Sequence, residues 1–315
     1  MLLSRSEALF LRSQETAQQI IHARVALAFI VLQLVGGCGL LIVLLTAAIG
    51  RGVKRYSTWY SFGASWVFSC VCYTLLAFAG QRTGPDPEFG LCVIQMALIY
   101  AAPSLTACTT LSLIIHMLLN LRRLLANAPF RTNSGAVAAL LIVPYLVWLA
   151  EFLGVLLYGI STPDTVRRSL NGTYCNSKNP LLSKISALIV VCCTVLTVAL
   201  QGIIALRLYR NRTVISGCSQ SVTMAIRVMV FSLVGALALG VAIAYVVTYQ
   251  HDQAFDMILA SLPVMAFLIF GSQPDLARVW MCRRDRTCQA AEKSLLLSHS
   301  QYSSVSTQEL SPYDT

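Results

Sequence analysis

Seven long apolar segments, separated by short polar loops, constrain the fold of this chain more than any other feature. A helix needs about 20 predominantly apolar residues to cross the hydrocarbon core of a bilayer. Backbone polar groups find no water inside a bilayer, so a chain with several such segments is expected to fold as a helix bundle. The predicted spans are residues 25–49, 57–79, 91–121, 136–158, 181–208, 224–249 and 255–271.

The composition agrees with a membrane protein. Apolar residues make up 57% of the chain and charged residues 11%, whereas a soluble domain carries about 25% charged residues. We therefore predict an all-α integral membrane protein with one domain, embedded in the lipid bilayer. Residues 1–24 are expected to form an extracellular tail, residues 272–284 an amphipathic interfacial helix, and residues 285–315 a disordered cytoplasmic tail.

The positive charge follows the expected membrane topology. The net charge is +10, but lysine and arginine lie in short clusters between the apolar segments, so nucleic acid is not an expected partner. Fifteen of these residues fall on the side that carries the carboxyl tail and eight on the other, which places the amino terminus outside. The sequon at Asn171 then lies outside, where it can be glycosylated. A second sequon, at Asn211, would lie inside in this orientation. Glycosylation at Asn211 would instead indicate the inverted orientation.

The segment 91–121 is expected to organise the bundle. A helix of this length reaches about 45 Å, more than a bilayer core requires. Cys92 lies at its outer start, and Cys175 lies in the loop between the fourth and fifth segments. A bond between them would tie this loop over the mouth of the bundle, on the side where disulfides persist. The alternative is two unpaired thiols.

Seven spans, an external amino terminus and this placement of cysteines together resemble the G-protein-coupled receptor superfamily, from Val25 to Arg284. Tyr56-Ser-Thr-Trp59 and Phe270-Gly-Ser-Gln-Pro-Asp275 are similar to seven-span receptor-like proteins of mushroom-forming (basidiomycete) fungi. The best-known receptor family has an acid-Arg-aromatic triplet where this chain has Asn120-Leu121-Arg122-Arg123, so the resemblance is to the architecture of the superfamily. It implies a plasma-membrane receptor with an extracellular ligand and a heterotrimeric G protein.

Polar and ionisable groups inside a membrane are costly, which makes them the first candidates for a site. His116 is expected to form a hydrogen bond between helices. The candidate ligand-binding residues are Glu151, Gln95, Tyr100, Tyr245 and Asp256.

Basic residues near the inner ends of the spans are candidates for contact with the G protein, and their alternative role is to set the topology. The candidate G-protein contacts are Arg122, Arg123, Arg131, Arg210 and Arg212.

Cys282 and Cys288 are candidate palmitoylation sites.

Other function classes find less support in the sequence. A zinc hydrolase needs about three protein ligands, but His116 is the one histidine within a predicted span. An enzyme, a metal or a cofactor is therefore not expected. Residues 255–271 contain no lysine for a retinal Schiff base. A transporter or channel for a small solute remains the alternative function, although no inverted repeat is evident.

Overall fold

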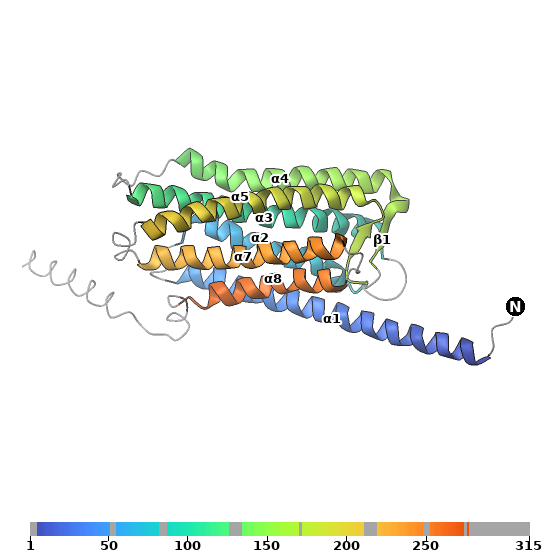
Figure 1. The fold of residues 1–315 in the computed structure, drawn as a ribbon. Coiled ribbons are helices and arrows are strands. Elements are labelled where there is room, and N and C mark those ends of the chain that lie inside the picture. Colours follow the sequence, from blue (N-terminus) through green and yellow to red (C-terminus); the bar gives the residue numbers. More distant parts are fainter. Residues whose placement is uncertain are drawn as a thin grey trace, which may run out of the picture.

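The computed structural model contains seven helices and one two-stranded hairpin within the described residues (Figure 1). The backbone is described for residues 5–50, 55–81, 87–125, 134–169, 172–210, 219–247, 253–273 and 276. The side chains are described for the same residues except 5–19, 124–125, 219–225, 241–247 and 253–256. The helices are α1 (Arg5–Ile49), α2 (Ser57–Phe78), α3 (Phe89–Leu125), α4 (Ser134–Ser161), α5 (Pro180–Arg210), α7 (Ser219–Val247) and α8 (Gln253–Gly271).

The prediction of an all-α membrane bundle is confirmed in its main features. Five helices, from α1 to α5, are long and apolar enough to cross a membrane, and α7 and α8 contain the shorter apolar stretches Ile226–Gly240 and Met257–Gly271 within the described side chains. The helices α2 to α8 begin and end within a few residues of the predicted spans. Most of the predicted interfacial helix and all of residues 285–315 lie outside the described residues.

The first helix differs most from the expected boundaries. It begins at Arg5, twenty residues before the predicted span that starts at residue 25. Residues 5–24 contain no proline or glycine, and they include several strong helix formers. Nothing in the sequence therefore stops the helix before the apolar segment begins, although the apolar part that can cross a membrane starts only at Ile20.

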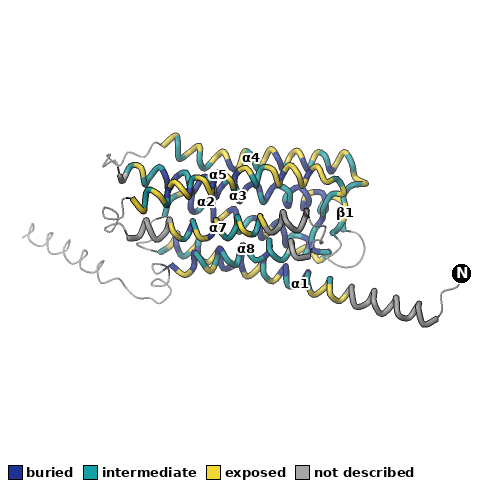
Figure 2. The backbone as a smooth tube through the Cα atoms, viewed as in Figure 1, coloured by how far each residue is buried: buried dark blue, intermediate teal, exposed yellow. Residues whose placement is uncertain are grey.

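The helix α3 lies at the centre of the bundle. Among its most apolar 18 residues 61% are buried, against 17% in α4 and 17% in α5 (Figure 2). It packs against α2, α4, α5 and α7 and against both strands of the hairpin. The expectation that this segment organises the fold is confirmed. Its buried polar side chains are Gln95, Ser104, Thr106, Thr109, Thr110, Ser112 and His116.

An aromatic cluster joins α2 to α7 and α8. The ring of Phe62 lies 5.5 Å from that of Phe231 and 5.3 Å from that of Phe270, measured between centroids. Trp66 packs edge-to-face on Phe231, and Trp59 packs edge-to-face on Phe270. Edge-to-face pairs of this kind contribute about 0.5–1.5 kcal/mol beyond the burial of their area. The cluster thus fixes α7 and α8 against the second helix.

A close approach of backbones holds α1 against α8. A Cβ atom added at Gly36 would lie 2.6 Å from the Cβ of Pro263 and 2.8 Å from the backbone nitrogen of Val264. Small residues at helix contacts in membranes permit such an approach. Because the obstacle includes backbone atoms of α8, it cannot move away by a change of rotamer.

Replacement of Gly36 by alanine is therefore expected to lower the free energy of unfolding by about 1–3 kcal/mol, the usual cost of overpacking. Thermal unfolding in detergent measures the effect. Gly154→Ala is the matched control, because an added Cβ at this position meets no atom within 4 Å. Equal stability of the two variants would contradict the close contact between α1 and α8.

Candidate functional site

A β-hairpin lies between α4 and α5, at the end of the bundle that we call the hairpin end. After a short helix at Pro163–Thr165, strand β1 (Val166–Arg168) pairs antiparallel with β2 (Cys175–Ser177), and Arg168 is opposite Cys175. The turn contains Gly172 at a φ of +67°, a conformation that glycine adopts without strain. The sequence analysis expected a plain loop here, since strands of three residues are too short to show a periodic pattern.

The predicted disulfide is confirmed. Cys92, in the first turn of α3, is bonded to Cys175 in β2, with the two Cα atoms 5.4 Å apart and a sequence separation of 83. Both cysteines are buried. The bond anchors the second strand of the hairpin to the start of the central helix.

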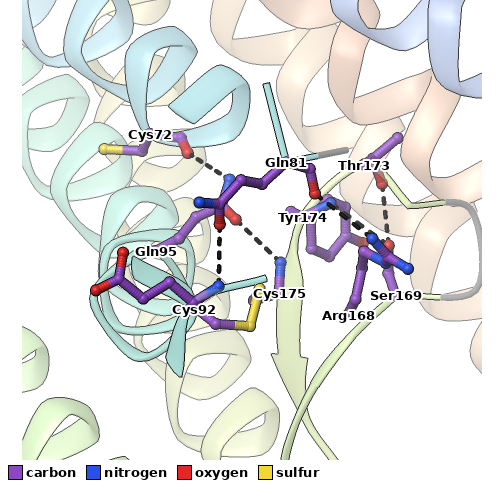
Figure 3. Close-up of a disulfide and its surroundings, with 10 residues drawn as sticks. Cys72, Gln81, Cys92, Gln95, Arg168, Ser169, Thr173, Tyr174 and Cys175 are labelled. Atoms are coloured by element: carbon purple, nitrogen blue, oxygen red, sulfur yellow. Dashed lines mark hydrogen bonds between the residues drawn. A yellow bond between two sulfur atoms is a disulfide. The ribbon is translucent and has the colours of Figure 1, made fainter. Parts of the chain in front are cut away.

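Two of the predicted ligand-binding residues hold the same hairpin. The side-chain amide of Gln95 donates to the carbonyl oxygen of Cys72 at 3.3 Å, and its oxygen accepts from the backbone nitrogen of Cys175 at 3.1 Å (Figure 3). The hydroxyl of Tyr100 accepts from the backbone nitrogen of Ser177 at 3.4 Å. These contacts give Gln95 and Tyr100 a structural role, and their contact with a ligand stays a prediction.

The hairpin also contacts the first two helices. The ring of Tyr174 lies 6.2 Å from that of Phe29 in α1 and 6.0 Å from that of Tyr73 in α2. Arg168 donates to the carbonyl oxygen of Gln81, just after α2, at 3.5 Å (Figure 3). The hairpin is thus fixed to α1, α2 and α3 together and covers this end of the bundle.

Glu151 is a buried acid between α3, α4 and α5. Its side chain is 9% exposed, and neither carboxylate oxygen has a hydrogen-bond partner among the described residues. Ser104 and Ser186 lie beside the carboxyl group. The Ser104 hydroxyl is fully buried and has no partner among the described residues, whereas the Ser186 hydroxyl donates to the carbonyl oxygen of Tyr100 at 2.7 Å.

Unpartnered polar atoms are rare in protein interiors. The carboxyl oxygens of Glu151 and the hydroxyl of Ser104 lie at one junction of helices without a well-formed hydrogen bond among the described residues, although Ser104 and Ser186 are near enough to donate to the carboxyl group. An oxygen cluster of this kind can accept hydrogen bonds from a bound molecule that carries several N–H or O–H groups. Ser186 connects this cluster to Tyr100, and through Tyr100 to the hairpin.

The opposite end of the bundle is called the basic end, because α3 reaches Arg122 and Arg123 there. His116 is buried nearby and shares a hydrogen bond of 2.8 Å with the hydroxyl of Thr58 in α2. Its ring packs at 4.8 Å from that of Tyr56. The predicted role of His116 as a bond between helices is confirmed.

Two further arginines bind the end of α8. Arg227, in α7, donates to the carbonyl oxygen of Ile269, to the hydroxyl of Ser272 at 2.7 Å and to the carbonyl oxygen of Ser272 at 3.0 Å. Arg55 donates to the side-chain oxygen of Gln273 and lies over the ring of Trp59. Carbonyl groups at the last turn of a helix lack partners within the helix and carry a partial negative charge. A guanidinium group supplies both hydrogen-bond donors and a compensating positive charge at this end of the helix.

Sequence reasoning missed Arg227 as a site residue. It lies within the predicted span 224–249, so a search for every ionisable group inside a span would have found it. Among the predicted G-protein contacts, Arg122 and Arg210 are exposed and Arg123 is half-buried. Predicted residues outside the described residues or side chains are Arg131, Arg212, Asn171, Cys282, Cys288, Tyr245 and Asp256.

Taken together, these features define a helical membrane-embedded bundle with a disulfide-anchored hairpin at one end and a basic surface at the other. The apolar faces of α4 and α5 carry many exposed large side chains, as expected for helices in contact with lipid. Neither the known protein families nor the curated proteins include a match to this chain.

Proposed function

We propose that the chain is a seven-span receptor of the G-protein-coupled type in the plasma membrane, with its amino terminus and the hairpin end outside. The observation that carries the proposal is the bond between Cys92 and Cys175. Disulfides persist in oxidising compartments, so this bond favours an external hairpin end. The basic end, with Arg122 and Arg123, is then cytoplasmic, in agreement with the positive-inside rule.

The candidate ligand contact is the oxygen cluster of Glu151 and Ser104. A ligand with N–H or O–H donors would satisfy oxygen atoms that have no partner among the described residues. It would act as an agonist only if it binds one arrangement of α3, α4 and α5 more tightly than the other, because equal affinity shifts no equilibrium.

The candidate contact with the G protein lies at the basic end. Arg122 and Arg123 end the central helix there, about 45 Å along the helix from Cys92. Arg210 ends α5 and is exposed. Because α3 contacts most of the bundle, a shift of this helix at the hairpin end would be transmitted to these arginines.

Nucleotide exchange on co-expressed G-protein α subunits tests the proposal. We expect basal exchange with the wild-type chain and its loss in the double variant Arg122→Ala/Arg123→Ala at equal surface level. Arg167→Ala is the matched control, because Arg167 is an exposed arginine of β1 at the hairpin end, and it should retain exchange. Absence of exchange with every α subunit would contradict the receptor and favour the transporter.

A further inference from the structure

Two free thiols on different helices are in contact inside the bundle. The sulfur atoms of Cys108 in α3 and Cys193 in α5 lie 3.5 Å apart. A disulfide has a sulfur–sulfur distance of about 2.05 Å, so the two atoms would have to approach by roughly 1.5 Å. Neither cysteine belongs to the bond between Cys92 and Cys175, and neither has a role in the function proposed above.

The two thiols of the pair differ in exposure. Cys108 is half-buried, whereas Cys193 is buried more deeply. Cys108 is therefore the thiol of the pair that an incoming oxidant reaches first.

The lipid face of α5 determines which oxidants can reach the pair. Cys192, next to Cys193, is exposed, and so are Leu188, Val195 and Leu196 on the same helix. In a membrane these side chains contact hydrocarbon, where small water-soluble oxidants are scarce. Hydroperoxides of lipid chains form and dissolve in this same region.

We propose that Cys108 and Cys193 form an oxidation site for lipid-soluble hydroperoxides, which converts the two thiols into a disulfide between α3 and α5. In the first step the sulfur of Cys108 attacks the terminal oxygen of the hydroperoxide, the O–O bond breaks, and an alcohol leaves with the thiol proton. In the second step the sulfur of Cys193 displaces water from the sulfenic acid of Cys108. The thiol pair loses two electrons, and the hydroperoxide is reduced to one alcohol and one water.

The bond would add a second covalent link to the central helix. The first fixes the hairpin to α3, and the second would fix the distance between α3 and α5 near the middle of the bundle. Thiol reductants would restore the free pair, so the modification is reversible. This inference does not depend on coupling to a G protein.

The test uses the full-length protein in lipid nanodiscs with cumene hydroperoxide as the probe. Remaining thiols are blocked with N-ethylmaleimide, the protein is digested, and peptides are identified by mass spectrometry. We expect a linked peptide pair that joins Cys108 to Cys193, is absent without hydroperoxide and is lost after reduction.

Matched variants identify the two partners. Cys193→Ser should abolish the linked peptides, while Cys192→Ser should leave their yield unchanged, since Cys192 is exposed on the same turn. The wild-type result stands even if a variant fails to fold. Oxidation of Cys192 or Cys38 with no link between Cys108 and Cys193, or a link from Cys108 to Cys192 instead, would overturn the proposal.

Discussion

Replacement of Cys92 by serine is expected to lower the free energy of unfolding by about 2–4 kcal/mol. The bond closes a loop over a sequence separation of 83 residues, so its loss restores much conformational freedom to the unfolded chain. It also releases the hairpin strand whose backbone nitrogen Gln95 binds. Thermal unfolding in detergent and the level of protein at the cell surface both measure this loss.

The double variant Cys92→Ser/Cys175→Ser gives the sharper result. Two partners of one bond should not have additive effects, so the double variant is expected to be no less stable than Cys92→Ser alone. Cys192→Ser is the control, because this exposed thiol is free and packs little. Losses that add in the double variant would show that the two sulfur atoms act separately.

Arg227 is expected to be the most sensitive arginine of the basic end. It makes three hydrogen bonds to residues at the end of α8, two of them to carbonyl oxygens of Ile269 and Ser272. Hydrogen bonds of a charged group contribute about 1.5–3 kcal/mol, and after loss of Arg227 the carbonyl oxygen of Ile269 keeps only the hydroxyl of Ser272 as a donor among the described residues. Arg227→Gln should therefore destabilise the protein by about 2–3 kcal/mol.

Hydrogen exchange can show where in the structure the loss of Arg227 acts and how large the effect is. Amides of the last turn of α8 should exchange faster in Arg227→Gln, while those of α4 should not change, because the hydrogen bonds of Arg227 within the described part of the chain go to Ile269 and Ser272. Arg227→Lys should recover only part of the stability, since an ammonium group lacks the forked geometry of the guanidinium. Arg210→Gln serves as the control at an exposed position. Unchanged exchange in α8 would contradict the role of Arg227.

The parts of the fold that depend on local pattern were predictable from the sequence. Apolar segments of sufficient length gave the boundaries of α2 to α8 within a few residues, and the positions of Cys92 and Cys175 indicated the disulfide. His116 was correctly expected to bond between helices, because a lone histidine in a span is more often an interhelical hydrogen bonder than a catalyst.

The remaining features depend on contacts between distant residues. Gln95 and the backbone of Cys175 are 80 residues apart, so no local pattern indicates that this side chain supports a hairpin instead of lining an open cavity. The partners of Arg227 are more than 40 residues away in the next helix. The contact of Cys108 with Cys193 was hidden for the same reason, since buried cysteines are more often simple packing residues.

Glycosylation mapping tests the orientation on which the receptor proposal rests. The chain is expressed in eukaryotic cells, and its mobility is compared before and after treatment with peptide N-glycosidase. We predict a glycosidase-sensitive shift that is lost in Asn171→Gln and retained in Asn211→Gln, because the loop that contains the hairpin should face outside. A shift that persists in Asn171→Gln and disappears in Asn211→Gln would invert the bundle and contradict the account.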